Sequence, residues 1–432
     1  MLCSVAPIRS ASRNQIAYLC FRFLQDFALI YPVYVILFRR TGLDYVQVAH
    51  LLAIWAAAVV ILEIPSGVLA DLWSRRLSVC IALLLKAGGF LVWLLRPDFV
   101  GFALGFVLWG FQEALCSGTV DALLYDGLKT VGREGSFERI AGWGLAVARA
   151  AIGLALVLGG WVFSRNPAIV LVASSAAMVL GAASALFMTE SRPDRNRSPH
   201  HDGQLTEPGE QRELPGAASD LRSALGEIGR TVREAWAVAG LVPFVLFAGF
   251  TVTVYGVLDE YDFLFGTLHG VPVAWIGVWG LLRFTLEGIG GAVAPRLARR
   301  LGGEDLRPLV AWIATAGVLV VLGTLWMRPA LLPLYFCFYG MMAAAEVLVQ
   351  GHIQRRIGSS GRATVGSIVS SVSTLFGIAQ ILLLGWISEA FSLELIFPAG
   401  GIMIIGGSAF YLVVLLLKQG RWTGSPPTAA DS

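Results

Sequence analysis

The chain has 432 residues, of which 56% are hydrophobic and only 14% are charged, and its mean hydropathy is +0.72. Soluble proteins carry about 25% charged residues, so this composition excludes a soluble globular domain and favours lipid as the solvent. The formal net charge of +3 is too small to indicate a nucleic-acid partner.

Apolar runs long enough to cross a membrane follow one another along the chain. A membrane-spanning helix needs about 20 mostly apolar residues. In the first half, spans are predicted at residues 15–38, 45–70, 77–96, 99–125, 138–163 and 167–189. In the second half they are predicted at residues 237–265, 272–295, 308–327, 330–353, 366–388 and 393–417. The predicted fold is an all-α integral membrane protein with twelve transmembrane helices.

A polar interval divides these spans into two sets of six. Residues 190–236 are rich in Arg, Glu, Asp, Pro, Gly and Ser, which is typical of a solvated linker. The predicted organisation is an N-terminal six-helix bundle (1–189), a cytoplasmic linker (190–236), a C-terminal six-helix bundle (237–418) and a cytoplasmic tail (419–432). No cleavable signal sequence is expected, because the first apolar run contains Arg22 and Asp26 and no small-residue cleavage site follows it.

The distribution of basic residues predicts the orientation. Of the 32 Lys and Arg residues, five fall in the loops that would be outside and four within spans, which leaves 23 on the side of the termini. Basic residues accumulate on the cytoplasmic side of membrane proteins. Both termini are therefore predicted to be cytoplasmic, and the protein is expected in the cytoplasmic (inner) membrane as a multi-pass protein.

The two sets of spans are related by an internal repeat. The stretch Gly67–Arg76 has a partial copy at Gly291–Arg300, displaced by 224 residues, in which Pro295 stands where the first copy has Asp71. The same offset aligns Glu63 with Glu287. One offset that serves several spans predicts two parallel halves, which is a known plan among transporters.

The motif Gly67–Arg76 resembles the signature loop between the second and third helices of the major facilitator superfamily, with Gly67, Asp71, Arg75 and Arg76 in the matching places. The resemblance extends over essentially the whole chain. It implies two pseudo-symmetric six-helix bundles that alternate between inward and outward access. It also implies that Asp71 approaches the N-terminus of the eleventh helix, where the helix dipole favours a negative charge, and so latches the two halves together.

Further segments resemble a bacterial efflux-like branch of this superfamily. These are Ser117–Asp126, in which Asp121 is assigned to the gate motif, and Arg362–Thr364 before the eleventh helix. Two departures from the pattern of drug antiporters stand beside this resemblance. The span 99–125 has Gln112-Glu113 and no Arg, and Ala155-Leu156 replace the Gly-Pro dipeptide that precedes the paired glycines Gly159-Gly160.

Ionisable residues inside spans are the candidate site. A charged side chain at the centre of a span costs about 2.5–3.5 kcal/mol on insertion scales, so each one requires a partner or an aqueous cavity. Arg22 and Asp26 are four residues apart, and they either neutralise one another or leave Asp26 in the cavity to exchange a proton. Arg283 and Glu287 have the same spacing.

Three more acidic positions complete the candidate pathway. Glu113 lies near the middle of the span 99–125, where it would carry a proton, bind a cation, or rest as a neutral carboxyl on a backbone carbonyl; Arg149 is its candidate partner. Glu260, between two aspartates near the outer end of its span, belongs to an exposed rim or to a vestibule that attracts cations. Glu346 is one turn from Gln350 and is expected to point inward.

The sequence contains no motif for ATP hydrolysis, catalysis or metal binding. The chain has no phosphate-binding glycine loop ending in Lys-Ser/Thr and no nucleophile–base arrangement, so neither ATP hydrolysis nor catalysis is predicted. Metal binding is not predicted either, because the five cysteines are scattered and His200-His201 have no further ligands. No cofactor is expected.

The predicted function is secondary active transport of a small molecule, coupled to protons, with export of a drug-like or amphiphilic compound as the first hypothesis. The alternatives are proton-coupled uptake of a metabolite, or a non-transporting sensor or scaffold with the same fold. The expected partners are the substrate, protons and the lipid bilayer, and the expected state is a monomer without nucleic acid.

Overall fold

The computed structural model describes residues 5–72, 74–190, 241–301, 303, 305–356 and 362–418. Within these ranges, side chains are not described at 5–12, 64–72, 354, 356, 362–368 and 418. Apart from Glu190, the predicted linker, including His200 and His201, lies outside the described residues, as does the predicted tail 419–432. The described ranges are helical and contain no strand.

The first half of the chain forms one bundle. Its helices are α1 (Val5–Asp26), α2 (Tyr34–Arg40), α3 (Tyr45–Leu72), α4 (Arg75–Leu95), α5 (Phe99–Cys116), α6 (Thr119–Lys129), α7 (Phe137–Phe163) and α8 (Pro167–Ala185), with a 3-10 turn, η1, at Glu134–Ser136. Polar residues begin several of these helices at the membrane boundary. Asp98 accepts a hydrogen bond from the Gly101 N–H at 2.8 Å, and this bond, with Arg96 beside it, lowers the pKa of the Asp98 carboxyl.

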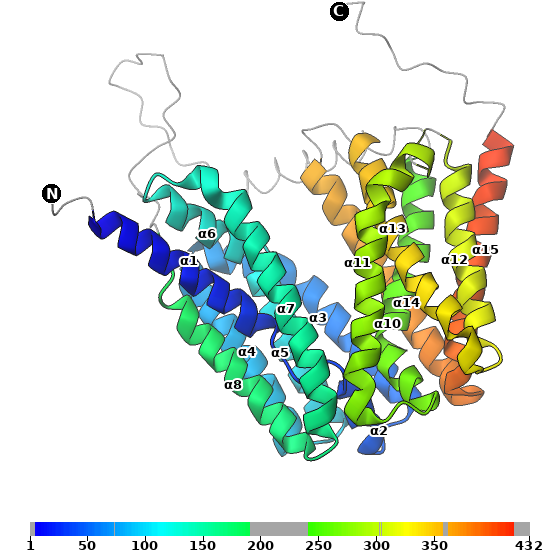
Figure 1. Ribbon diagram of the computed structural model, residues 1–432, viewed down its shortest axis with the longest axis horizontal. Coiled ribbons are helices and arrows are strands. Elements are labelled where there is room, and N and C mark those ends of the chain that lie inside the picture. The colour runs from blue at the N-terminus through cyan, green and yellow to red at the C-terminus, as the bar shows by residue number, and fades with distance from the viewer. Residues whose placement is uncertain are drawn as a thin grey trace, which may run out of the picture.

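The second half forms the other bundle (Figure 1). Its helices are α10 (Leu241–Leu268), α11 (Ile276–Leu301), α12 (Arg307–Thr324), α13 (Leu332–Arg356), α14 (Arg362–Ala390) and α15 (Ile396–Lys418), with 3-10 turns η2 (Val273–Trp275), η3 (Pro329–Leu331) and η5 (Leu393–Leu395). The start of α1 and the end of α15 lie toward the same end of the molecule, the upper end in Figure 1. We call this the terminal end and the opposite one the far end.

Eleven helical segments in the described ranges are long and apolar enough to cross a membrane. The twelfth predicted span, 15–38, is not among them because it is divided. Helix α1 ends at Asp26, and the chain then runs without helix until α2 begins at Tyr34. The prediction of one continuous helix at 15–38 is wrong in this respect, although twelve spans in two bundles are confirmed as the architecture.

Proline explains the break in the first span. Pro32 has no N–H and disfavours the helical conformation of the residue before it. A backbone group freed at membrane depth needs a partner within the protein. Here the Ile30 N–H donates to Ser174 Oγ of α8 at 3.2 Å, and Ser174 in turn donates to the Val170 carbonyl at 2.7 Å. The break is therefore anchored to α8.

The span predicted at 99–125 also bends. Helix α5 ends at Cys116 and α6 begins at Thr119, with Gly118 between them at φ +70°, a conformation that favours glycine. Glu113, predicted near the middle of a continuous helix, consequently lies in the last turn of α5, beside the bend.

Glycines bring the two bundles together at the far end. The bundles touch through α3 with α14 and through α7 with α11 and η2. A Cβ atom on Gly277 of α11 would lie 1.9 Å from the Leu156 carbonyl of α7, and one on Gly385 of α14 would lie 2.3 Å from the Ala49 Cβ of α3. Only glycine permits backbones to approach this closely. Tyr45, the first residue of α3, donates its N–H to Glu389 of α14 at 3.0 Å.

Candidate functional site

Three cavities that share lining residues lie between and beside the two bundles. One cavity lined from both bundles has a volume of about 270 Å³ and includes Tyr31, Tyr34, Trp109, Arg149 and Asp259 in its wall. A second, of about 330 Å³, shares Leu52, Trp55 and Glu260 with it. A third, of about 530 Å³, is lined by α10, α13 and α14 and adjoins the second.

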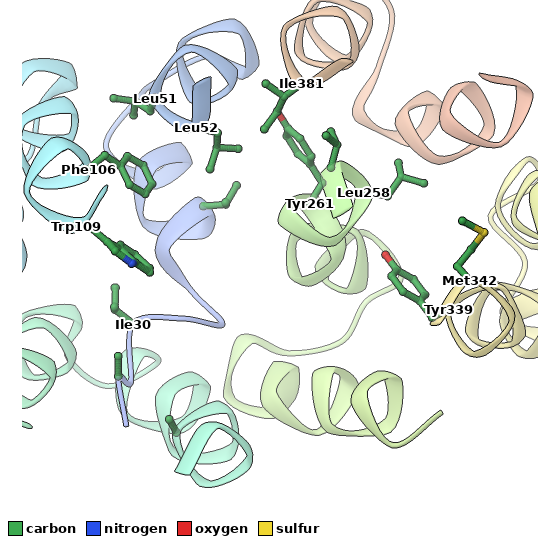
Figure 2. Close-up of a cluster of buried hydrophobic side chains, with 14 of the residues drawn as sticks. Ile30, Leu51, Leu52, Phe106, Trp109, Leu258, Tyr261, Tyr339, Met342 and Ile381 are labelled. Carbon is green, nitrogen blue, oxygen red and sulfur yellow. The ribbon is translucent and has the colours of Figure 1, made fainter. Parts of the chain in front are cut away.

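Aromatic rings form the first-bundle wall of the 270 Å³ cavity. The rings of Tyr31 and Trp109 stack with their centroids 5.5 Å apart, and the Trp55 and Trp109 rings lie at 6.0 Å. Figure 2 shows Trp109 and Phe106 on the first bundle, with Tyr261 and Tyr339 on the second. This wall offers flat apolar surfaces to a ligand.

A buried lysine lies behind this wall. Lys86 of α4 is only 3% exposed; its Nζ donates to the Tyr31 hydroxyl at 2.9 Å and lies 4.5 Å from the centre of the Trp109 ring. The Trp109 indole N–H donates to Glu113 Oε1 at 3.0 Å. Lys86 therefore joins Tyr31, Trp109 and Glu113 in one polar network.

Lys86 is an additional partner, not suggested by the sequence, for the two acids of the first bundle. The electrostatic partners of Glu113 are Lys86 and, with the same sign of charge, Asp26, whereas Arg149 is not among them. Asp26 interacts most strongly with Lys86 and less with Arg22 and Arg149. No ion pair joins Arg22 to Asp26 among the described side chains. Asp26 is therefore shared among Lys86, Arg22 and Arg149, and the predicted pairing of Arg149 with Glu113 has no supporting contact among the described side chains.

Lys86 is a residue of this network for which the sequence predicts no role. The sequence does contain an indication of a role, since a lone lysine in a 21-residue apolar helix requires a buried partner. The partner could not be found in the sequence because Tyr31 is 55 residues away and lies in the break of the first span.

The second bundle contains a denser cluster around Arg283 of α11. The Arg283 side chain is 1% exposed and forms ion pairs with Asp259, with Asp262 at 2.9 Å and with Glu287 at 2.9 Å. The Arg283–Glu287 contact is the pair that the spacing of four residues predicted. We call Arg283, Asp259, Asp262 and Glu287 the Arg283 cluster.

Asp262 lies inside the bundle rather than at an exposed rim. It is fully buried and accepts hydrogen bonds from the Trp279 indole N–H at 2.7 Å and from the Tyr335 hydroxyl. The interpretation of this acidic segment as a hydrated rim is therefore wrong for Asp262. The other two acids of the segment, Asp259 and Glu260, line the 270 Å³ cavity.

Glu260 connects the bundles. The Tyr34 hydroxyl of α2 donates a hydrogen bond to Glu260 Oε2 of α10, so a carboxyl of the second bundle is held by a side chain of the first. Glu346 of α13 lines the 530 Å³ cavity, where it accepts a hydrogen bond from Gln350 at 3.4 Å. Both acids thus lie at cavities.

The gate motif is partly described. Arg75 forms an ion pair with Asp126 of α6 at 2.6 Å, which ties α4 to α6 within the first bundle at the terminal end. The surroundings of Gly67 and the side chain of Asp71 are not described, so the predicted latch of Asp71 to the eleventh helix lies outside the described residues. Asp121 is exposed.

Arg76 lies in a separate pocket at the terminal end of the first bundle. It is half-buried and shares the wall of this pocket with Arg13 and Glu190. Pro295, at the position matched to Asp71, lies inside α11.

The overall arrangement is similar to several solved transporter structures. One is the nucleoside transporter NupG, with a TM-score of 0.66 at 12% identity, covering 96% of this chain and 100% of that one. Another is a bacterial homolog of the human lysosomal transporter Spinster in an inward-facing, occupied conformation, with a TM-score of 0.67 at 16% identity, covering 96% and 98%. At such identities the likeness establishes the fold.

The POT family transporter PepTSo is also similar, with a TM-score of 0.65 at 12% identity, covering 96% of this chain and 99% of that one. No curated protein sequence matches the chain. The family model of the Major Facilitator Superfamily matches residues 16–381. With its two six-helix bundles around a shared cavity, the chain therefore belongs to the Major Facilitator Superfamily of membrane transporters.

Proposed function

We propose that this protein is a secondary active transporter that couples the movement of a small molecule across the cytoplasmic membrane to protons. The observation that carries the proposal is the set of ionisable groups at the contact between the bundles. This set comprises the Arg283 cluster together with Glu260, which Tyr34 of the other bundle holds.

The charges of this set do not balance. Four carboxyls, those of Asp259, Glu260, Asp262 and Glu287, face a single guanidinium, that of Arg283. Unpaired carboxylates away from water are costly, so such a site takes up protons or another cation. Protons that bind here and leave when the site opens to the other side provide the coupling.

The contact between Tyr34 and Glu260 links this exchange to conformation. It exists while α2 and α10 are close, and separating the bundles at the far end breaks it. Glu260 then has water in place of the tyrosine. The two conformations give Glu260 different surroundings and therefore different affinities for a proton. Proton binding favours the conformation with the higher affinity, and so shifts the balance between the two.

The predicted topology gives these conformations a direction. With both termini in the cytoplasm, the far end faces outward, and the glycine contacts of α7 with α11 and of α3 with α14 close the outer side. The described conformation is then the inward-facing one. We also propose a monomer, with domain limits at 189/190, 236/237 and 418/419.

Export of a drug-like or amphiphilic compound is the first choice of direction and cargo. The aromatic wall with Trp55 and Trp109 supports an amphiphilic ligand. Proton-coupled uptake and a non-transporting sensor are the alternatives. A growth screen of an overexpressing strain against toxic compounds tests the direction, since export raises the tolerated concentration and uptake lowers it.

Transport in proteoliposomes with an imposed pH gradient tests the coupling. The wild type is compared with Glu260→Gln, Glu113→Gln and Asp26→Asn, and with Glu394→Gln, an exposed acid in η5, as the matched control. We expect a gradient to drive accumulation in the wild type and the control, and Glu260→Gln to transport without responding to the gradient. Equal, gradient-independent movement in all five proteins contradicts proton coupling.

A further inference from the structure

Arg149 presents a positive charge to the cavity between the bundles. It projects from α7, its side chain is exposed, and it lines the 270 Å³ cavity. No ion pair of Arg149 occurs among the described side chains. Its electrostatic partner is Asp26, at a greater separation than an ion pair. A guanidinium so placed is a ready partner for a carboxylate or phosphate.

The opposite wall of the same cavity is acidic. Asp259 and Glu260 line it from α10, and the Asp259 side chain remains 39% exposed although one of its oxygens contacts Arg283. Arg283 is shared with Asp262 and Glu287, so it does not neutralise this wall. A ligand ammonium group finds carboxylate oxygens here.

The two walls belong to different bundles and do not neutralise one another. No ion pair joins Arg149 to Asp259 or Glu260 among the described side chains, although all three line one cavity. The aromatic side chains of Trp55, Trp109 and Phe263 line the same cavity. A molecule with an anionic and a cationic group at its two ends, and an apolar or aromatic body between them, complements this arrangement.

We propose that the transported substrate is a small zwitterion with an aromatic or apolar body, whose anionic group binds Arg149 and whose ammonium group binds Asp259 and Glu260. The inference rests on the proposed function and specifies its substrate class. The volume of about 270 Å³ limits the ligand to a small molecule. A purely cationic ligand leaves Arg149 uncompensated in a cavity that closes, and a purely anionic one leaves the acids uncompensated.

Binding to the purified full-length protein tests the charge requirement. The probes are aromatic and aliphatic amino acids and dipeptides, each compared with its C-terminal amide, which is only cationic, and its N-acetyl derivative, which is only anionic. Thermal unfolding reports binding, because a ligand that binds the folded state raises the melting temperature. We expect at least one zwitterion to stabilise the protein, and both of its derivatives to bind on the order of 10- to 100-fold more weakly.

Two variants test which residue binds each charged group of the ligand. Arg149→Gln should remove the preference for the zwitterion over its amide, and Asp259→Asn should remove the preference over its N-acetyl derivative. Arg139→Gln is the matched control, because Arg139 is an exposed arginine on the same helix that lines none of the three cavities. The control should keep both preferences.

The outcomes separate this proposal from the proposed function. Amides that bind as tightly as their parents, or a panel in which no zwitterion stabilises the protein, overturn the zwitterion assignment. If lipophilic cations then elicit gradient-driven transport in proteoliposomes, proton-coupled transport stands and only the substrate class is wrong. If no compound responds to an imposed pH gradient, the proposed function fails as well.

Discussion

Lys86 and Glu113 form opposite ends of one network in the first bundle, with Tyr31 and Trp109 between them. We expect Lys86→Met to lower transport by roughly tenfold or more, because it leaves Asp26 and Glu113 without their nearest cation. Transport by Lys86→Met in proteoliposomes, measured beside the double variant Lys86→Met/Glu113→Gln, checks this. The double variant should recover part of the loss, with a coupling of about 0.5–3 kcal/mol. Independent, additive effects of the two substitutions contradict the network.

Arg283 holds three carboxylates and supports the folded state directly. Replacing it by Leu leaves the fully buried Asp262 without its cation, and we expect a loss of about 3–5 kcal/mol in the free energy of unfolding. Asp262→Asn is the matched control, since the amide oxygen still accepts the hydrogen bonds of Trp279 and Tyr335. Reversible unfolding in a denaturing detergent measures both variants. A loss in Arg283→Leu no larger than that in Asp262→Asn contradicts the view that Arg283 stabilises the protein by compensating the buried charge of Asp262.

The predictability of these partners depends on their separation in the chain. Arg283 and Glu287 are one helical turn apart, so the sequence alone indicated their pair. Lys86 with Tyr31, and Tyr34 with Glu260, are brought together only by the packing of different helices. A charged residue in an apolar segment of the sequence indicates that a buried partner is needed, but it does not indicate which helix supplies that partner.

At the level of helices, the break in the first span depends on one hydroxyl. Ser174→Ala removes the acceptor of the buried Ile30 N–H, and we expect it to destabilise the protein by about 1–3 kcal/mol. Ser184→Ala on the same helix is the control, because among the described residues the Ser184 hydroxyl donates to the Gly181 carbonyl within its own helix. Unfolding in detergent measures the difference. A Ser174→Ala variant as stable as the control shows that Ile30 finds another acceptor.

A glycine contact limits how far the bundles approach. In Gly277→Ala the new Cβ would collide with the Leu156 carbonyl, so we expect the far end to open and the described conformation to become less populated. Distances between spin labels on the two bundles at the far end measure this shift. In the control, Gly153→Ala, the nearest atom is Leu281 Cδ1 at 3.7 Å, an ordinary contact. Unchanged distances in Gly277→Ala mean that the contact does not control closure.

Helix boundaries were less predictable than helix number. Hydropathy indicates where a segment enters and leaves the membrane, and it led to twelve spans in two sets of six. Hydropathy does not reveal the effects of Pro32 and Gly118. The backbone preferences of these two residues interrupt two spans, although the neighbouring residues are apolar. Both interruptions lie near candidate site residues, Tyr31 and Glu113, so these errors concerned the site more than the fold.

For the whole molecule, the proposed alternation between two conformations requires the far end to open. Tyr45 of α3 and Glu389 of α14 face each other across the bundles there, joined by a hydrogen bond of 3.0 Å. We expect the variant Tyr45→Cys/Glu389→Cys, in a background without the native cysteines, to stop transporting once a short thiol reagent cross-links it. Because the cavities stay formed in this conformation, the cross-linked protein should still bind ligand from the terminal side.

A cross-link within one bundle separates locking from damage. Arg96→Cys/Asp98→Cys provides it, since these two side chains contact each other at 2.9 Å in the turn between α4 and α5, also at the far end, and both belong to the first bundle. That variant should transport equally with and without the reagent, because rigid bundles that rock against each other need no motion inside this turn. Transport in proteoliposomes before and after a cleavable cross-linker is reversed measures both. If the protein joined at Tyr45 and Glu389 keeps transporting, the two bundles need not separate at this contact, and alternation proceeds through smaller movements of single helices.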